Sequence, residues 1–307
     1  MVGRGRGTHS EDPTQPERIE AGQSGVLLDK RLVIVSGKGG VGKSAVSAGL
    51  ALLAQRRGLR VLAIEMGSPG GLSAHFSTGP LKFKPREVRP GLHAMEIVRS
   101  EALLEYLSLQ LRLPGMGRFG PFARAFDALA TAAPAIREII TIGKVLWEVK
   151  EDRWDLVVAD APPTGQIGSY LRAPLSISEL VPTGRIRQQS EWMQEALRNS
   201  DDTSLMIVNM PEELPTTETL QTIHWLDAEQ LVAKPIVVTN RVLPQINDID
   251  SPGGVIGEMA LLHRSLWSEQ QQWLGQIDDD LRLPYMFGLF TPGEVAARMS
   301  DELEALR

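Results

Sequence analysis

The sequence of 307 residues contains no cysteine. This absence excludes disulfide bridges, thiolate metal sites, iron–sulfur clusters and cysteine nucleophiles. Apolar runs are short, and none approaches the roughly 20 residues that a membrane-spanning helix requires. Positive charge is in deficit, since 32 Lys and Arg residues stand against 38 Asp and Glu residues, for a net charge of −6. That balance does not favour binding to nucleic acid or to an anionic membrane surface.

Residues 1–26 are rich in Gly, Pro, Arg and Glu and lack the apolar segment of a secretory signal. We expect a disordered tail there, and an arm that binds a partner is the alternative. Without a signal segment, we expect a cytoplasmic location. Residues 27–307 are predicted to form a single domain, because their length and composition suit one large globular core.

The chain opens with alternating strand and helix patterns. Residues 31–37 ("RLVIVSG") form an apolar run that leads into a Gly-rich loop, residues 44–58 have the pattern of a helix, and a second strand is expected at 60–66. This order predicts an α/β doubly wound fold, with a mostly parallel sheet and helices on both faces. Further continuous apolar runs, typical of strands buried on both sides, lie at 92–98, 154–160, 204–210, 235–242 and 281–287.

Residues 100–150 contain no strand candidate and two helical patterns, separated by a Gly/Pro-rich break at 114–121. We therefore predict a helical insertion lobe of about 50 residues. Leu104, Leu107 and Leu111 would either pack inside this lobe or contact a bound client. Other helices are expected at 184–199, 255–279 and 293–307.

The stretch "GKGGVGKS" runs from Gly37 to Ser44 and fits the pattern G-x-x-x-x-G-K-[ST]. Glycines let backbone N–H groups converge on phosphate oxygens, and the helix that follows adds a favourable dipole. Lys43 would reach the β and γ phosphates, and the Ser44 hydroxyl would bind Mg²⁺. The predicted cofactors are therefore ATP or ADP with Mg²⁺. A small-molecule kinase is an alternative, but it leaves Lys38 unexplained.

The string "KGGVGKS" resembles the deviant phosphate loop of one branch of P-loop ATPases. "DAPPTG" (160–165) is similar to the second switch of the arsenite-pump and tail-anchored-protein-targeting ATPase family within that branch. "AAPAIREIITIGKVLWE" (132–148) and "VNMPEELPTTET" (208–219) resemble further segments of the same family. The resemblance implies a P-loop NTPase fold and a face-to-face dimer, in which Lys38 stabilises phosphate charge on the partner's nucleotide.

The resemblance also implies roles for single residues. Asp160 would stand near Mg²⁺ and, with Lys38, form the catalytic set, whereas Ser44 and Asp160 would form the metal set. Asn240 falls at the family's adenine-contacting position, although an asparagine at a strand end could equally form an Asx turn. The predicted nucleotide-binding residues are Gly37, Gly39, Gly40, Val41, Gly42, Lys43, Ser44, Ala45, Asn240 and Arg241.

The first switch, "IEMGSPGGLSAHF" (64–76), departs from the family pattern. Gly67 stands where hydrolysing members have the aspartate that positions the attacking water, and Ala74 replaces a second aspartate. Glu65 would have to reach in from the strand end. Because loss of a water-positioning group costs orders of magnitude in rate, the chain is either a weak ATPase or a nucleotide-binding regulatory subunit that barely hydrolyses ATP.

The expected partners follow from the same resemblance. The closest subgroup is a set of cysteine-free bacterial paralogues proposed to act in pairs, so we expect a homodimer or a heterodimer with a paralogous ATPase. A protein or membrane-protein client is a further expectation, whereas nucleic acid is not. Eukaryotic-type targeting members join their dimer through zinc bound to paired cysteines, and the absence of cysteine excludes that zinc clamp here.

Overall fold

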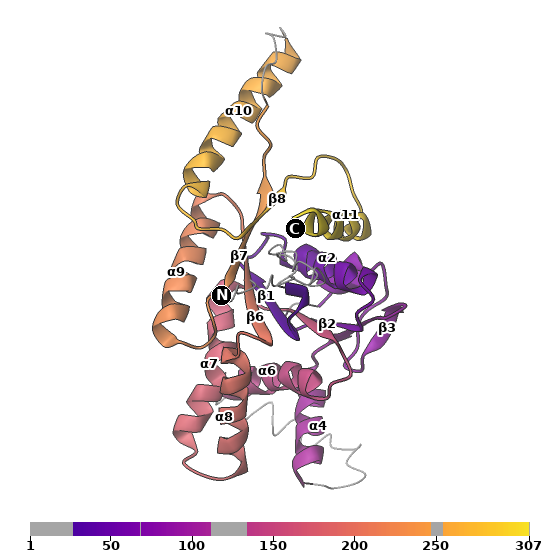
Figure 1. Cartoon of the computed structure of the whole chain (residues 1–307), viewed down its shortest axis with the longest axis vertical. Coiled ribbons are helices and arrows are strands. Elements are labelled where there is room, and N and C mark those ends of the chain that lie inside the picture. The colour runs from indigo at the N-terminus through magenta and orange to yellow at the C-terminus, as the bar shows by residue number, and fades with distance from the viewer. Residues whose placement is uncertain (1–26, 68, 112–133, 247–253, 307) are drawn as a thin grey trace, which may run out of the picture.

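The computed structural model describes residues 27–67, 69–111, 134–246 and 254–306 (Figure 1). The predicted tail at 1–26 and the break at 114–121 lie outside these ranges. The division of the chain into a tail and a single domain with an insertion therefore stays a prediction.

A single sheet forms the centre of the described structure. Each of its strands except β3 overlaps one of the apolar runs expected from the sequence. The strands are β1 (Leu32–Gly37), β2 (Val61–Glu65), β3 (Arg86–Arg89), β4 (Leu92–Glu96), β5 (Leu156–Asp160), β6 (Thr203–Asn209), β7 (Ile236–Val242) and β8 (Leu281–Pro284). Over the described residues their order is β3-β4-β2-β5-β1-β6-β7-β8. Every neighbouring pair is parallel except β3 with β4. The carboxyl ends of the parallel strands therefore meet at one edge, with β1 near the middle.

Helices cover both faces of this sheet, which confirms the predicted fold class (Figure 1). One face carries α2 (Lys43–Arg56), α3 (Gly71–His75) and α11 (Pro292–Ala305). The other carries α4 (Arg99–Leu111), α6 (Pro134–Lys150), α7 (Thr164–Leu180), α8 (Arg185–Arg198) and α9 (Glu213–Glu229). The remaining long helix, α10 (Val255–Leu274), extends away from the sheet at one end of the molecule.

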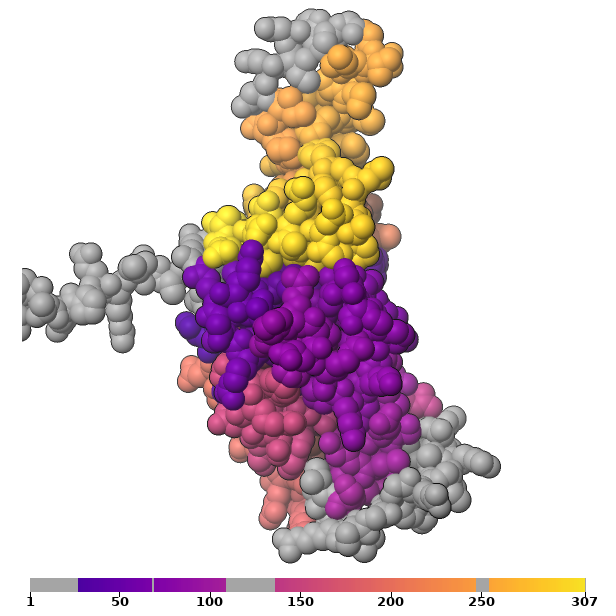
Figure 2. Space-filling view, turned by 90° about the vertical axis from the view of Figure 1, so that its right-hand side faces the viewer, coloured from indigo at the N-terminus to yellow at the C-terminus, as the bar shows by residue number. Residues whose placement is uncertain are grey.

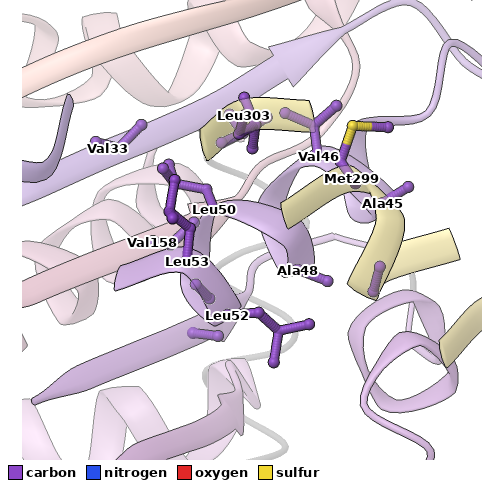
Figure 3. Packing of buried hydrophobic residues seen from close by; sticks show 14 of the residues in the cluster. Val33, Ala45, Val46, Ala48, Leu50, Leu52, Leu53, Val158, Met299 and Leu303 are labelled. Atoms are coloured by element: carbon purple, nitrogen blue, oxygen red, sulfur yellow. The ribbon is translucent and has the colours of Figure 1, made fainter. Parts of the chain in front are cut away.

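The C-terminal helix packs on its own domain. Met299 and Leu303 of α11 are buried against α2, where Figure 3 shows them beside Val46 and Leu50. Figure 2 shows the yellow α11 lying directly on the indigo and purple N-terminal half of the chain. The fit is close, since a Cβ added to Gly49 of α2 would lie 2.6 Å from Met299 Cγ. This contact fixes the position of α2, the helix that follows the phosphate loop.

Elements without a counterpart among the ranges expected from the sequence include β3, α3 and α7. β3 reads Arg-Glu-Val-Arg and is mostly exposed, so it has no apolar pattern and is defined only by its hydrogen bonds to β4 at the sheet edge. In the lobe, α6 packs directly on the sheet through Ile142, Val145 and Leu146. No helix in the described part of the chain is both long and apolar enough to cross a membrane.

Candidate functional site

The phosphate loop connects β1 to α2 at the carboxyl edge of the sheet. Gly37 has φ = 147° and lies so close to β6 that an added Cβ would stand 2.1 Å from the carbonyl oxygen of Val208. Gly42 has φ = 99°, and a Cβ there would stand 2.5 Å from Asn240 Nδ2. Both positions combine a left-handed backbone with no room for a side chain, which is why the loop requires glycine there.

Asp160 ends β5 directly beside the start of α2. Its carboxylate accepts hydrogen bonds from Ser44 Oγ at 2.6 Å and from Ser47 Oγ at 3.3 Å. The two hydroxyls lie one helical turn apart, and each donates to a different oxygen of this buried carboxylate. The structure thus brings together Ser44 and Asp160, the two residues that the sequence nominates for a metal.

This donor pair suits Mg²⁺, which prefers oxygen ligands and is usually held by one or two protein groups together with phosphates and water. The described residues contain no group of three or more His, Cys, Asp or Glu side chains that could form an all-protein metal cage. Ser44 and Asp160 would hold the ion through the two oxygens that now share a hydrogen bond. A bound Mg²⁺ would neutralise charge on the β and γ phosphates.

Burial raises the pKa of the Asp160 carboxyl to about 6. Hydrogen bonds from Ser44 and the charge of Lys43 lower it, while the nearby Glu65 carboxylate adds to the increase. Because a buried carboxylate prefers its proton, the folded chain binds that proton more tightly than the unfolded chain does. The stability of the ligand-free protein therefore falls as pH rises from about 4 to about 6.

We expect Asp160→Asn to stabilise the nucleotide-free chain at pH 7.5, by up to about 3 kcal/mol, because it removes the buried charge. The gain should shrink at pH 4.5, where the wild-type carboxyl is itself protonated in the folded state. Thermal unfolding midpoints at the two pH values measure the effect. Asp155→Asn is the control with opposite sign, since Arg60 lowers the pKa of Asp155. An equal or lower midpoint for Asp160→Asn at pH 7.5 would contradict the prediction.

Lys43 lies half-buried inside the loop, where its Nζ donates to the carbonyl oxygen of Lys38 at 3.1 Å. Removal from water lowers the pKa of Lys43, and the negative charges of Asp160 and Glu218 only partly oppose this. The ammonium group is therefore poorly solvated and faces the loop. An anion placed in the loop would relieve that cost, which is the behaviour expected of a phosphate-binding lysine.

Lys38 points to a different partner. Its Nζ forms an ion pair with the carboxylate of Glu218 on α9, and the other oxygen of Glu218 accepts a hydrogen bond from Thr164 Oγ1 at 2.8 Å. The charge-assisted bond from Lys38 lowers the pKa of Glu218. Glu218 therefore links the extra lysine of the phosphate loop to the threonine of "DAPPTG". Gly165, the next residue, lies beside the same carboxylate.

Glu65 is buried at the end of β2 and holds the loop that follows it. Its carboxylate accepts hydrogen bonds from the backbone N–H groups of Gly70 at 3.1 Å and Leu72 at 3.0 Å. A Cβ added to Gly71 would stand 2.6 Å from Ser44 Oγ and 3.2 Å from Glu65 Oε1, so the first switch lies against the phosphate loop. Both Glu65 oxygens are engaged in shaping this loop.

Asn240 lies buried at the end of β7 and supports the phosphate loop from the side. Its Nδ2 donates to the carbonyl oxygen of Val41 at 2.8 Å, and its Oδ1 accepts from the N–H of Arg241 at 2.9 Å. Arg241 has a left-handed backbone with φ = 61°. The predicted contacts of Asn240 and Arg241 with the nucleotide stay predictions, as do those of Gly39, Gly40 and Ala45.

Sequence reasoning missed Ser36, Ser47 and Glu218. Ser36 Oγ donates to the carbonyl oxygen of Pro162 at 2.7 Å and so ties β1 to the second switch. Ser47 follows Ser44 by three residues on α2, a spacing that places both on one helix face and could have identified it. Glu218 is 180 residues from Lys38, and no local pattern marks such a pair.

The fold and this site together define a P-loop nucleotide-binding protein: a Gly-rich loop between a central parallel strand and a helix, with a buried lysine and a strand-ending aspartate. The family model described as anion-transporting ATPase matches residues 30–188, and the chain belongs to that family. It is therefore an ATP-binding P-loop ATPase, as the sequence motifs indicate.

Three relatives illustrate the range of this similarity. The chain is 32% identical to ATPase BagA of Mycobacterium tuberculosis over 244 residues, which is 76% of this chain and 72% of that protein. It is 27% identical to ATPase GET3 of Podospora anserina over 295 residues, covering 82% and 83% of the two chains. ATPase GET3 of Kluyveromyces lactis is 26% identical over 293 residues, covering 81% and 80%.

Proposed function

We propose that this ATPase acts as a nucleotide-gated dimer, in which each Lys38 leaves Glu218 of its own chain and reaches the phosphates bound by its partner. The observation that carries this proposal is the unequal placement of the two lysines. Lys43 lies inside the loop and faces the phosphate position, whereas Lys38 is directed away from the loop and held by α9. A lysine that is not used by the phosphate site of its own chain is suited to stabilise phosphate charge on a partner chain.

Glu218 would couple this movement to the second switch. It contacts both Lys38 and Thr164, and Thr164 begins α7, whose other end reaches the helical lobe. When the γ-phosphate draws the second switch toward the loop, the Thr164 contact would break, and Glu218 would lose one of its two partners. Closure around ATP would then release Lys38 and move α7 together.

Hydrolysis by this chain is proposed to be slow. Neither Gly67 nor Ala74 provides a carboxylate, and both oxygens of Glu65 accept backbone hydrogen bonds within the first switch. No described carboxylate of the first switch is thus free to orient water. The ATP-bound, closed dimer would accordingly last longer than in a fast ATPase. A long-lived closed state suits a subunit that controls a partner through its nucleotide state.

The helical lobe offers a place for an apolar client. A cavity of about 630 Å³ lies between α4, α6, α7 and α8, and its lining includes Tyr106, Ile139, Trp147 and Met193. This volume lies within the range of protein ligand sites. Leu104 and Leu107 are half-buried on α4 and lie outside the lining, whereas the side chain of Leu111 is outside the described part of the structure. Movement of α7 would reshape this cavity.

The dimer and the role of Lys38 are tested by a pair of variants. Lys38→Ala should leave ATP affinity within about threefold of wild type, since Lys43 supplies the phosphate contact, but should abolish ATP-dependent dimerisation. Glu218→Gln should strengthen that dimerisation, because it removes the ion pair that holds Lys38 within its own chain. Light scattering with and without ATP and Mg²⁺ reports the mass.

Arg60→Ala is the matched control, because it removes the basic partner of Asp155 in an ion pair at the amino ends of β2 and β5, away from the phosphate loop, α7 and α9. It should not alter the nucleotide response. An ATP-dependent dimer that persists in Lys38→Ala, or a Glu218→Gln variant that dimerises less than wild type, would refute the proposed exchange of partners.

A further inference from the structure

The carboxyl end of β7 contains a bulge beside the phosphate loop. Between the pairs Thr239–Arg282 and Val242–Pro284, β7 advances by three residues while β8 advances by two, so β7 carries one extra residue. Within this stretch Arg241 has φ = 61°, a left-handed conformation that is unfavourable for a residue with a side chain. A bulge of this kind redirects a side chain and persists only where its surroundings support it.

The redirected side chain is that of Asn240, which is buried against the phosphate loop. Its Nδ2 donates to the carbonyl oxygen of Val41 at 2.8 Å, and its Oδ1 accepts from the N–H of Arg241 at 2.9 Å. Because a trans peptide is planar, fixing the carbonyl of Val41 also fixes the N–H of Gly42 on the opposite side of the same peptide. Asn240 therefore sets the direction of one N–H group of the phosphate loop.

The support for the bulge comes from Gln270, near the C-terminal end of α10. Its Oε1 accepts a hydrogen bond from the N–H of Leu243 at 2.9 Å, and its Nε2 donates to the carbonyl oxygen of Arg241 at 3.1 Å. These partners fix the orientation of the amide, because a backbone N–H only donates and a carbonyl only accepts. The side chain thus bonds on both sides of Val242, as a residue of a neighbouring parallel strand would.

The neighbouring strands show why a side chain is needed there. The pairing of β6 with β7 ends at Asn209 and Thr239, three residues before Val242. On the β8 side, the carbonyl oxygen of Val242 accepts from the N–H of Tyr285 at 2.8 Å. Gln270 therefore takes the place of β6 along the last residues of β7, and α10 is the element that supplies it.

We propose that Gln270 is a positioning residue of the nucleotide site. Its amide keeps Arg241 in the left-handed conformation, the bulge keeps Asn240 against Val41, and Asn240 keeps the phosphate loop in the form that receives nucleotide. Four hydrogen bonds carry this connection from α10 to the loop. A displacement of α10 would accordingly weaken nucleotide binding without removing any phosphate-binding side chain.

The first experiment compares two neighbouring glutamines of α10. Gln270→Ala should lower ATP affinity by about tenfold, because both hydrogen bonds to the bulge are lost. Gln271→Ala is the matched control, since Gln271 is exposed and its side chain forms no hydrogen bond with the residues that the structure describes. Its ATP affinity should stay within about twofold of wild type. Calorimetric titration with ATP and Mg²⁺ at pH 7.5 measures both variants, below the thermal unfolding midpoint of each.

Gln270→Glu tests the donated bond by itself. A carboxylate can still accept from the N–H of Leu243, but it cannot donate to the carbonyl oxygen of Arg241. We therefore expect this variant to bind ATP no better than Gln270→Ala.

An Arg241→Gly background distinguishes positioning from a general loss of stability. Glycine adopts the left-handed conformation freely, so the bulge should persist there without Gln270. Gln270→Ala should then reduce ATP affinity by less than about threefold, against about tenfold when Arg241 is present. A contact that only stabilised the fold would lower the thermal midpoint in both backgrounds and leave the ATP affinity of the folded protein unchanged.

Hydrogen exchange of the Leu243 amide gives an independent readout. By linkage, ATP strengthens the Gln270 contact by the same factor as the contact strengthens ATP binding. In the wild-type chain this amide should exchange more slowly with ATP and Mg²⁺ than without, by up to about tenfold, and Gln270→Ala should remove the slowing. Unchanged ATP affinity in Gln270→Ala, an equal loss in Gln271→Ala, or a loss that persists in full in the Arg241→Gly background would each overturn the proposal.

Discussion

Lys43→Ala is expected to weaken ATP binding by about 30-fold or more. Truncating one member of a buried charged pair costs roughly 2–5 kcal/mol, and each 1.4 kcal/mol is a factor of ten. The physical reason lies in the ligand-free site, where Lys43 is already removed from water and its pKa is lowered. Phosphate binding therefore also relieves the unfavourable free energy of keeping the Lys43 ammonium group out of water.

The measurement is a calorimetric or fluorescence titration with ATP and Mg²⁺ at pH 7.5. Lys38→Ala is the control within the same loop, because it removes an equal charge five residues away whose partner is Glu218 rather than the phosphate. The thermal midpoint of each variant shows whether it is folded. An ATP affinity for Lys43→Ala within threefold of wild type would show that the loop does not hold phosphate through this lysine.

The parts of the fold that sequence alone predicts are those where local pattern and burial agree. β1, β5 and β6 read as unbroken apolar runs because both faces of each strand are covered by helices. The phosphate loop is readable because Gly37 and Gly42 sit where the backbone excludes every other residue. β3 was not predictable, since its charged side chains at an exposed edge carry no periodic signal.

In the candidate site, too, the contacts that follow from local motifs are predictable, and those that depend on tertiary packing are not. The closeness of Ser44 and Asp160 follows from two motifs whose strand ends meet at one edge of a parallel sheet. The ion pair of Lys38 with Glu218 depends on how α9 lies over that edge, and the sequence between them does not determine it. The exposure of α10 is of the same kind. Its residues form an acceptable amphipathic helix, and only the tertiary arrangement shows which apolar face is left uncovered.

The slow hydrolysis proposed for this chain leads to a gain-of-function prediction. Gly67→Asp should raise the rate of ATP turnover by about 100-fold or more, the usual contribution of a positioned general base. The position can accept the side chain, because an added Cβ would lie 3.7 Å from its nearest neighbour, Cα of Pro162, at an ordinary contact distance. The new carboxylate would stand between the first and second switches, where Glu65 does not reach.

Gly67→Asn is the matched control, since it adds nearly the same volume with an uncharged amide in place of the carboxylate. Steady-state phosphate release under saturating ATP and Mg²⁺ measures both variants against wild type, and ATP affinity should stay within threefold in all three. Equal turnover in Gly67→Asp and Gly67→Asn would mean that a carboxylate at this position does not activate water. If the wild-type chain already hydrolyses ATP at about 10 s⁻¹, the rate of a median enzyme, the water-positioning group lies elsewhere. The first residue to substitute would then be Glu65, which closure would have to release from Gly70 and Leu72.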